Sequence, residues 1–160
     1  MCIPVLIFFS INLAAQSGEQ KKYTKVPGGY LMVLRQGDSI INMLEDLAVK
    51  ENIPAAGLTG LGFAAYVKFG FFDAQTKQFI PKEIQDVELA GITGSIAWEN
   101  NKPSVHMHAA AGDKDLRTYS GHILTAAVGA GSVELMITVY ARKLQRKKDP
   151  ATGANVLQVE

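Results

Sequence analysis

The sequence has little cysteine, little histidine and almost no charge imbalance. Its 160 residues include one cysteine, Cys2, which excludes a disulfide framework and a thiolate-rich zinc site. Sixteen Lys and Arg residues against fifteen Asp and Glu leave a formal net charge of +1. A protein built mainly to hold nucleic acid carries a larger basic excess, so the composition gives that role no support. Apolar residues make up 48% of the chain, which is enough for the core of one domain.

The N-terminus carries an apolar run that is too short to form a stable membrane span. Residues 3–15 read IPVLIFFSINLAA, whereas a transmembrane helix needs about 20 apolar residues. Small residues end the run and charged residues follow it, as in a secretory signal peptide. We therefore expect residues 1–16 to be a signal peptide and the protein to be periplasmic or secreted. No Lys or Arg precedes the run, so the alternative stays open that it is a buried strand or helix of a cytoplasmic protein.

One amphipathic helix precedes a series of short strands. Apolar residues recur at helical spacing over residues 39–51, where Asp38 or Ser39 can cap the helix. Beyond this helix, apolar segments and turns alternate about every ten residues, which is typical of strands in an antiparallel sheet. The last two expected strands, 119–128 and 132–143, are separated by a Gly-Ala-Gly turn. This order predicts an α+β domain with an antiparallel sheet or barrel.

The expected domain spans residues 24–143, and a polar, basic tail follows over residues 144–160. A short basic cluster marks this junction, and its members are Arg142, Lys143, Arg146, Lys147 and Lys148. Such clusters are usually solvated, so we expect a loose C-terminus. The alternative is a weak, salt-sensitive contact with an anionic surface such as lipid headgroups or nucleic acid.

The three histidines lie where one β-hairpin can bring them together. His106 and His108 stand two apart in a predicted strand, so they share a face with Cα atoms about 6–7 Å apart. His122 lies in the next predicted strand, which can fold back beside the first. Three neutral imidazoles suit zinc, nickel, copper or ferrous iron and leave a coordination position open. The alternative is a chance grouping of histidines that hydrogen-bond to the backbone.

Several short motifs follow one another in a fixed order. These are GLG at residues 60–62, LAGITG at 89–94, KPSVHMH at 102–108 and SGHIL at 120–124. In this order they resemble the PPC domain, the "plants and prokaryotes conserved" family, over residues 30–141. The most specific part is K-P-x-x-H-x-H followed by G-H-I-L. The family often has two glycines before its third histidine, and Ser120 replaces the first of them here.

The resemblance implies a single helix packed on an antiparallel sheet, a fold similar to that of acetolactate decarboxylase, and assembly as a homotrimer. Acetolactate decarboxylase holds zinc with three histidines, so His106, His108 and His122 are the implied ligands of zinc or another divalent transition metal. Plant members carry AT-hooks beside the domain, which gave the family its DNA-binding label. The AT-hook core, Arg-Gly-Arg-Pro, is absent from this sequence, so we expect nucleic acid not to be a partner of an exported chain.

Two classes of function follow from these observations. The first is an exported homotrimer whose three-histidine metal site assists hydrolysis or lyase chemistry on a small-molecule ligand. Glu134, in the following predicted strand, is a candidate to orient an imidazole or to act as a general base, and the alternative for it is a subunit-interface or edge-strand carboxylate. The second class is a non-catalytic binding or assembly module with DNA binding as an inherited label. The sequence leaves open whether the protein is an enzyme.

Overall fold

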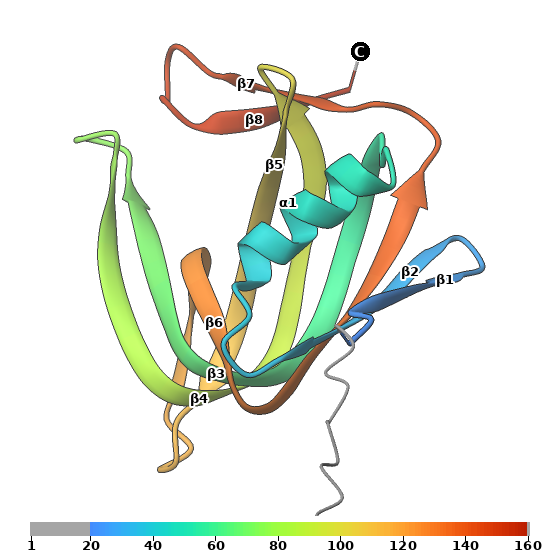
Figure 1. The fold of residues 1–160 in the computed structure, drawn as a ribbon. Helices are drawn as coiled ribbons and strands as arrows, with labels where there is room; N and C mark the ends of the chain where they lie inside the picture. The colour runs from blue at the N-terminus through green and yellow to red at the C-terminus, as the bar shows by residue number, and fades with distance from the viewer. Residues whose placement is uncertain (1–19, 160) are drawn as a thin grey trace, which may run out of the picture.

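One sheet carries most of the chain, and one helix packs on it (Figure 1). The computed structural model describes residues 20–159, so the expected signal peptide at residues 1–16 lies outside the described part. The elements are β1 (Tyr23–Val26), β2 (Gly29–Arg35), α1 (Ile40–Lys50), β3 (Ala55–Asp73), β4 (Gln78–Glu99), β5 (Lys102–Gly112), β6 (Thr118–Tyr140), β7 (Gln145–Lys148) and β8 (Asn155–Gln158). Within the described residues, no helix is both long and apolar enough to cross a membrane.

Four long strands close on themselves to form the body of the sheet. β3 pairs with β4, β4 with β5, β5 with β6 and β6 again with β3, and all four pairings are antiparallel. β2 and then β1 extend the sheet beyond β6, while β7 and then β8 extend it beyond β4. The prediction of an antiparallel, barrel-like sheet with one main helix is therefore confirmed.

β6 is one bent strand, and the prediction of two strands over residues 119–128 and 132–143 is wrong. Its two halves pair with successive parts of β3, so that Val128 lies opposite Ala64 and Val133 lies opposite Gly62. The register shifts between Gly62 and Ala64, where Gly62 has a φ of 146° that side chains disfavour. Glycines at this corner therefore bend the strand instead of reversing it. The same sequence signal had predicted a turn.

α1 lies against the concave side of the bent sheet (Figure 1), where it contacts β4, β5 and β6. Its buried positions, which fall on one face of the helix, are Ile40, Leu44, Leu47 and Ala48. Ser39 occupies the N-cap position, yet its side chain makes no capping hydrogen bond. Asp38 instead accepts hydrogen bonds from the Arg35 backbone N–H and the Lys22 ammonium. The helix is therefore held by packing and not by the predicted side-chain cap.

The C-terminal tail folds back as the hairpin β7–β8, so the expectation of a loose tail is wrong. Trp98 of β4 pairs in parallel with Gln145 of β7, and its backbone N–H donates to the Leu144 carbonyl over 3.0 Å. The Lys143 ammonium lies 4.6 Å from the centre of the Trp98 ring. Arg146, which we expected to be solvated, is only 6% exposed. These are contacts between distant parts of the chain, so no local sequence pattern announces them.

Candidate metal centre

The strand register brings the three histidines onto one patch of the sheet. In β5, His106 lies opposite Ser95 of β4 and His108 lies opposite Thr93, which places both imidazoles on the same face. On the other side of β5, His108 lies directly opposite His122 of β6. The prediction that β5 and β6 bring all three histidines together is confirmed.

Three imidazole nitrogens, one from each histidine, lie within 4.8 Å of one another. The ring centroids are 5.2 Å apart for His106 and His108, 4.9 Å for His106 and His122, and 5.4 Å for His108 and His122. Nitrogens bound to one zinc ion lie about 2.0–2.1 Å from it and hence about 3.3 Å from each other. Small changes in side-chain torsion therefore suffice for the three rings to hold one ion.

The surroundings keep two of these imidazoles neutral. Burial, together with the positive charge of Arg146 and the neighbouring His108, lowers the pKa of His106. Burial, His106, His108 and Arg146 lower the pKa of His122 from 6.5 to about 4. A metal binds only the unprotonated ring nitrogen. The site is thus prepared for a metal at neutral pH because protons do not compete for these two rings.

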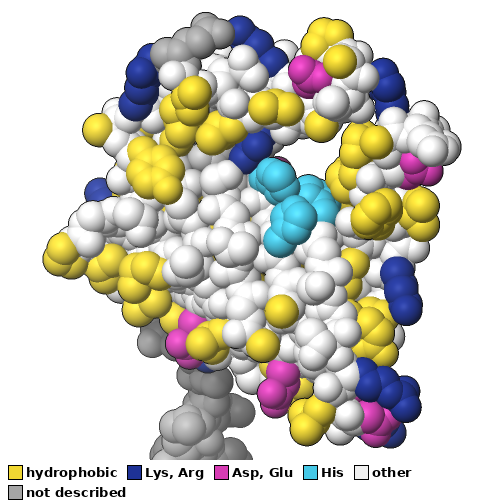
Figure 2. Space-filling view, turned by 180° about the vertical axis from the view of Figure 1, so that it is seen from behind, with side chains coloured by type: hydrophobic (Ala, Val, Ile, Leu, Met, Phe, Trp, Pro, Cys, Tyr) yellow, Lys and Arg dark blue, Asp and Glu magenta, His cyan; other side chains and the backbone are white. Residues whose placement is uncertain are grey.

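The histidines open into a cavity of about 700 Å³. Figure 2 shows the three rings together beside an opening in this face of the molecule, with a basic side chain next to them. Phe72 and Phe79 form an aromatic part of the lining. Phe79 stacks on His122 with ring centroids 4.7 Å apart and an interplanar angle of 21°, which limits rotation of that imidazole. A cavity of this size accommodates a small molecule.

The C-terminal hairpin supplies a part of the cavity that sequence reasoning missed. Arg146 of β7 and Asn155 of β8 line it. The Arg146 Nη2 donates a hydrogen bond to the Ser95 hydroxyl over 2.6 Å, and the Asn155 amide donates to the Glu99 carboxylate over 2.8 Å. Arg146 belongs to a basic cluster that is typical of solvated chain ends. The alternation of the short β7 segment offers no clear sign that this member points inward.

Glu134 lies apart from the histidines. It is exposed in the second half of β6, opposite Val33 of β2 and Leu61 of β3. A strand rises about 3.3 Å per residue, so the eleven residues between His122 and Glu134 carry the carboxylate away along β6. Glu134 is not among the residues that line the cavity. The arrangement within one chain therefore gives it no role at the three histidines.

Comparison with known proteins adds a family to this geometry. Residues 21–141 match the model of the Plants and Prokaryotes Conserved (PCC) domain. The chain belongs to this family. The match includes all three histidines but ends before β7, so the hairpin that carries Arg146 lies outside the matched region. None of the curated proteins matches the chain.

Solved structures share the fold of this PCC-domain chain. A "Putative DNA-binding protein" from Ralstonia eutropha JMP134 is 48% identical, with a TM-score of 0.85 over 87% of this chain and 96% of that one. A "Metal-containing Protein" from Archaeoglobus fulgidus is 22% identical, with a TM-score of 0.73 over 81% and 91% of the two chains. A Staphylococcus aureus protein "Similar to Alpha-acetolactate Decarboxylase" has 16% identity and a TM-score of 0.50, over 72% and 53%. The expected similarity in fold to a protein that resembles acetolactate decarboxylase is thus observed.

Proposed function

We propose that this protein binds a divalent transition metal ion, with zinc as the first candidate, through His106, His108 and His122. The observation that carries the proposal is the convergence of three imidazole nitrogens within 4.8 Å. Neutral imidazoles suit zinc and its neighbours in the first transition series, and the lowered pKa values of His106 and His122 favour the neutral form. The metal-containing relative from Archaeoglobus fulgidus, which shares the fold, supports the same assignment.

We further propose that the site assists hydrolysis or lyase chemistry on a small molecule. A divalent ion held here supplies Lewis-acid polarisation of a carbonyl oxygen and acidification of water. The chain's own contribution is to fix the three rings through the β5–β6 ladder and through the stacking of Phe79 on His122. The cavity beside them holds the substrate and limits its contact with bulk water. Three protein ligands leave room in the coordination sphere, as in catalytic zinc sites.

The proposal includes export and assembly into a homotrimer. The apolar run at residues 3–15 supports export. The family resemblance supports the trimer, and so do the exposed side chains of Phe71 and Ile80, which are 74% and 58% accessible near the ends of β3 and β4. Light scattering on the purified protein measures the assembled mass. N-terminal sequencing of protein expressed with its full leader shows whether the first residues are removed.

Elemental analysis of protein purified without an affinity tag tests the metal site. We expect about one equivalent of metal per chain in the wild type and none in a His106→Ala/His108→Ala double variant. Glu134→Gln is the matched control on the same sheet and should keep the full metal content. A folded wild-type protein that holds no metal after incubation with zinc would contradict the proposal. A positive result justifies a screen of small esters, lactones and 2-oxo or 2-hydroxy acids.

The name of the Ralstonia relative supports a second candidate, a DNA-binding assembly module. The net charge of +1 provides little general attraction for the phosphates of DNA. The size of the cavity beside the histidines suits a small ligand instead. A gel-shift titration with A·T-rich and G·C-rich duplexes at 50 and 200 mM salt separates the two candidates. Tight binding that survives 200 mM salt would favour the DNA-binding module.

A further inference from the structure

Arg146 is a charged side chain that is buried without a full set of partners. The residue is 6% exposed, and no other charged residue in the described part of the chain is buried. Its Nη2 donates to Ser95, while its buried Nε has no hydrogen-bond acceptor. Within the described residues, no carboxylate lies at ion-pair distance from its guanidinium. Glu99 attracts it from further away and already accepts a hydrogen bond from Asn155.

Burying such a charge is unfavourable unless something compensates it. Proteins usually pair a buried guanidinium with a carboxylate, because its planar set of N–H donors matches an anion. Among residues 20–159, only the neutral Ser95 hydroxyl is a direct partner of this guanidinium. The compensating group is therefore expected from outside the described residues.

The cavity around Arg146 has the same deficit of negative charge. Besides the three histidines, its lining includes Lys77, and among the described residues that line it there is no Asp or Glu. Lys77 also links the two ends of the cavity wall, because its ammonium lies 3.4 Å from the Pro150 carbonyl in the β7–β8 turn. A divalent ion on the histidines would add two further positive charges. Like charges in a partly buried space repel one another, and an anion placed among them lowers the energy of all of them.

We propose that this cavity binds a small organic anion, a carboxylate or a phosphate ester, whose charged group contacts the Arg146 guanidinium while the rest of the molecule lies against the histidines and the aromatic wall. The anion contact depends on Arg146 alone, whereas the placement of the reacting part rests on the proposed metal function. Charge-assisted hydrogen bonds to guanidinium are about twice as strong as neutral ones and select anions over neutral analogues. Phe72 and Phe79 suit a short apolar portion of the same ligand.

The hairpin β7–β8 brings that charge to the site. Trp98 anchors the start of β7 through the Leu144 carbonyl, and Glu99 anchors β8 through Asn155. Both anchors sit at the end of β4, the same strand that carries Ser95. The matched family region stops at residue 141. The anion contact is therefore assigned to a part of this chain that the family match leaves unexplained.

Calorimetric titration of the zinc-incubated, full-length protein tests this inference. The probes are pyruvate, its neutral analogue pyruvamide, and inorganic phosphate, each added to wild type, Arg146→Gln and Lys147→Gln. Arg146→Gln removes the charge and keeps a donor for Ser95, and Lys147→Gln removes a neighbouring exposed charge as the matched control. Arg146→Lys retains the charge and guards against a loss of fold in the glutamine variant. Thermal melting and metal content are measured on every variant.

We expect at least one of the two anions to bind the wild type, about tenfold or more weaker binding in Arg146→Gln, and a change of less than about twofold in Lys147→Gln. Arg146→Lys should fall between wild type and Arg146→Gln. Preference for pyruvate or for phosphate tells which anion the site selects. Equal binding of pyruvamide and pyruvate, equal affinities in the two glutamine variants, or no binding of either anion would overturn the inference. If the protein binds the anion through Arg146 but takes up no metal after incubation with zinc, the proposed metal function is refuted and the anion site is not.

Discussion

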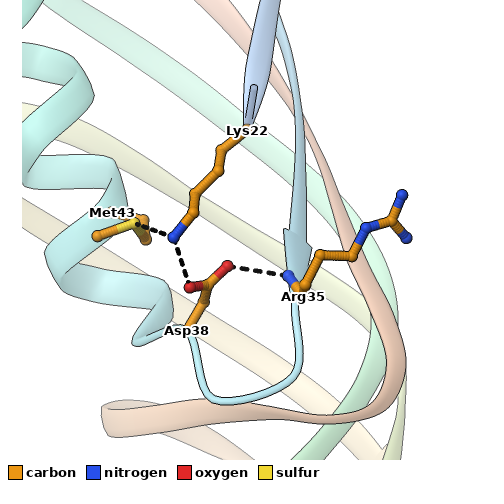
Figure 3. Close-up of polar contacts among 4 residues, drawn as sticks. All are labelled: Lys22, Arg35, Asp38 and Met43. Atoms are coloured by element: carbon orange, nitrogen blue, oxygen red, sulfur yellow. Dashed lines mark hydrogen bonds and ion pairs between the residues drawn. The ribbon is translucent and has the colours of Figure 1, made fainter. Parts of the chain in front are cut away.

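Two hollows of similar size differ in how their charges are satisfied. The histidine cavity is about 700 Å³, and a groove between α1 and β1 is about 640 Å³. In the groove, Lys22 lies 2.7 Å from Asp38 and also faces the Met43 sulfur (Figure 3). Nearby, Glu51 accepts hydrogen bonds from two tyrosine hydroxyls, each over 2.9 Å. Lys22, Asp38 and Glu51 each have a partner within the chain.

The histidine cavity shows the opposite arrangement. Among the described residues, its guanidinium has one neutral partner, its imidazoles line the cavity, and the lining offers no carboxylate. Charges that are paired within the chain fix the position of β1 and α1, as the groove shows. Charges that are left without partners beside a cavity indicate a ligand. The contrast explains why the histidine cavity, and not the groove between α1 and β1, is the candidate functional site.

The largest effect on metal binding is expected from the removal of one histidine. We expect His122→Ala to weaken zinc binding more than about 100-fold, because loss of a direct ligand should exceed the loss caused by an outer-shell partner. Competition with a chromophoric chelator measures the affinity. Asp38→Asn, a change in the groove region, is the control and should leave the affinity unchanged. Equal affinities in wild type and His122→Ala would show that the histidines are not the ligands.

Gly94 allows β4 and β5 to approach each other next to His106. A Cβ at this position would overlap the His106 carbonyl and the Met107 backbone. We expect Gly94→Ala to lower the free energy of unfolding by about 2–3 kcal/mol and to weaken metal binding as well, because His106 must move. Gly91→Ala is the matched control, since an added Cβ there meets nothing within 4 Å. Urea unfolding of both variants measures the difference, and similar losses would contradict the account.

The metal-free protein should lose stability in acid through His122. Its folded-state pKa is about 4 against an ordinary value of 6.5. Between these values the unfolded chain binds a proton that the folded chain does not, so stability falls as the pH drops from 6.5 to 4. The ring is partly exposed, so we expect a loss of about 1–2 kcal/mol rather than the full value of the shift. Urea unfolding at both pH values should show a smaller loss in His122→Gln. An identical pH dependence in that variant would refute this assignment.

The smallest effect is expected from a pair in the groove region. Burial raises the pKa of Asp38, but hydrogen bonds from the Arg35 N–H and from Lys22 outweigh burial and lower it overall. This carboxylate therefore stabilises the fold above its ordinary pKa of 3.8, and the contribution is lost as the pH falls through the lowered value. Asp38→Asn should cost about 1 kcal/mol at pH 7 and should not change metal content. A loss of metal in this variant would contradict the claim that the groove between α1 and β1 has no part in metal binding.

The sequence predicted those features that depend on local periodicity. The helix was expected over residues 39–51 and lies at Ile40–Lys50, because one apolar stripe recurs at helical spacing. The grouping of the three histidines followed from alternation in β5 and from one hairpin connection to β6. The alternation of short strands and turns left an antiparallel sheet and a barrel as alternatives, because no local pattern contains the closure.

Features that depend on distant contacts were not predictable in the same way. Glycines at residues 129 and 131 indicated a turn, yet pairing of both halves of β6 with β3 kept the strand continuous. By composition, Arg146 belongs to a cluster of basic residues that are usually solvated. Its burial depends on contacts of β7 with Trp98 and Ser95 of β4, which lie far away in the sequence. Glu134 was near His122 in strand order, but the length of β6 carries it away from the cavity. In each case tertiary pairing decided what local composition could not.

Anomalous X-ray diffraction from crystals of the zinc-loaded protein shows directly whether the three histidines hold the ion. We expect one strong peak, about 2.0–2.1 Å from a ring nitrogen of each of His106, His108 and His122. Crystals of His122→Ala grown in the same solution should lose that peak. A zinc peak elsewhere, or three histidines without a peak at saturating zinc, would contradict the account.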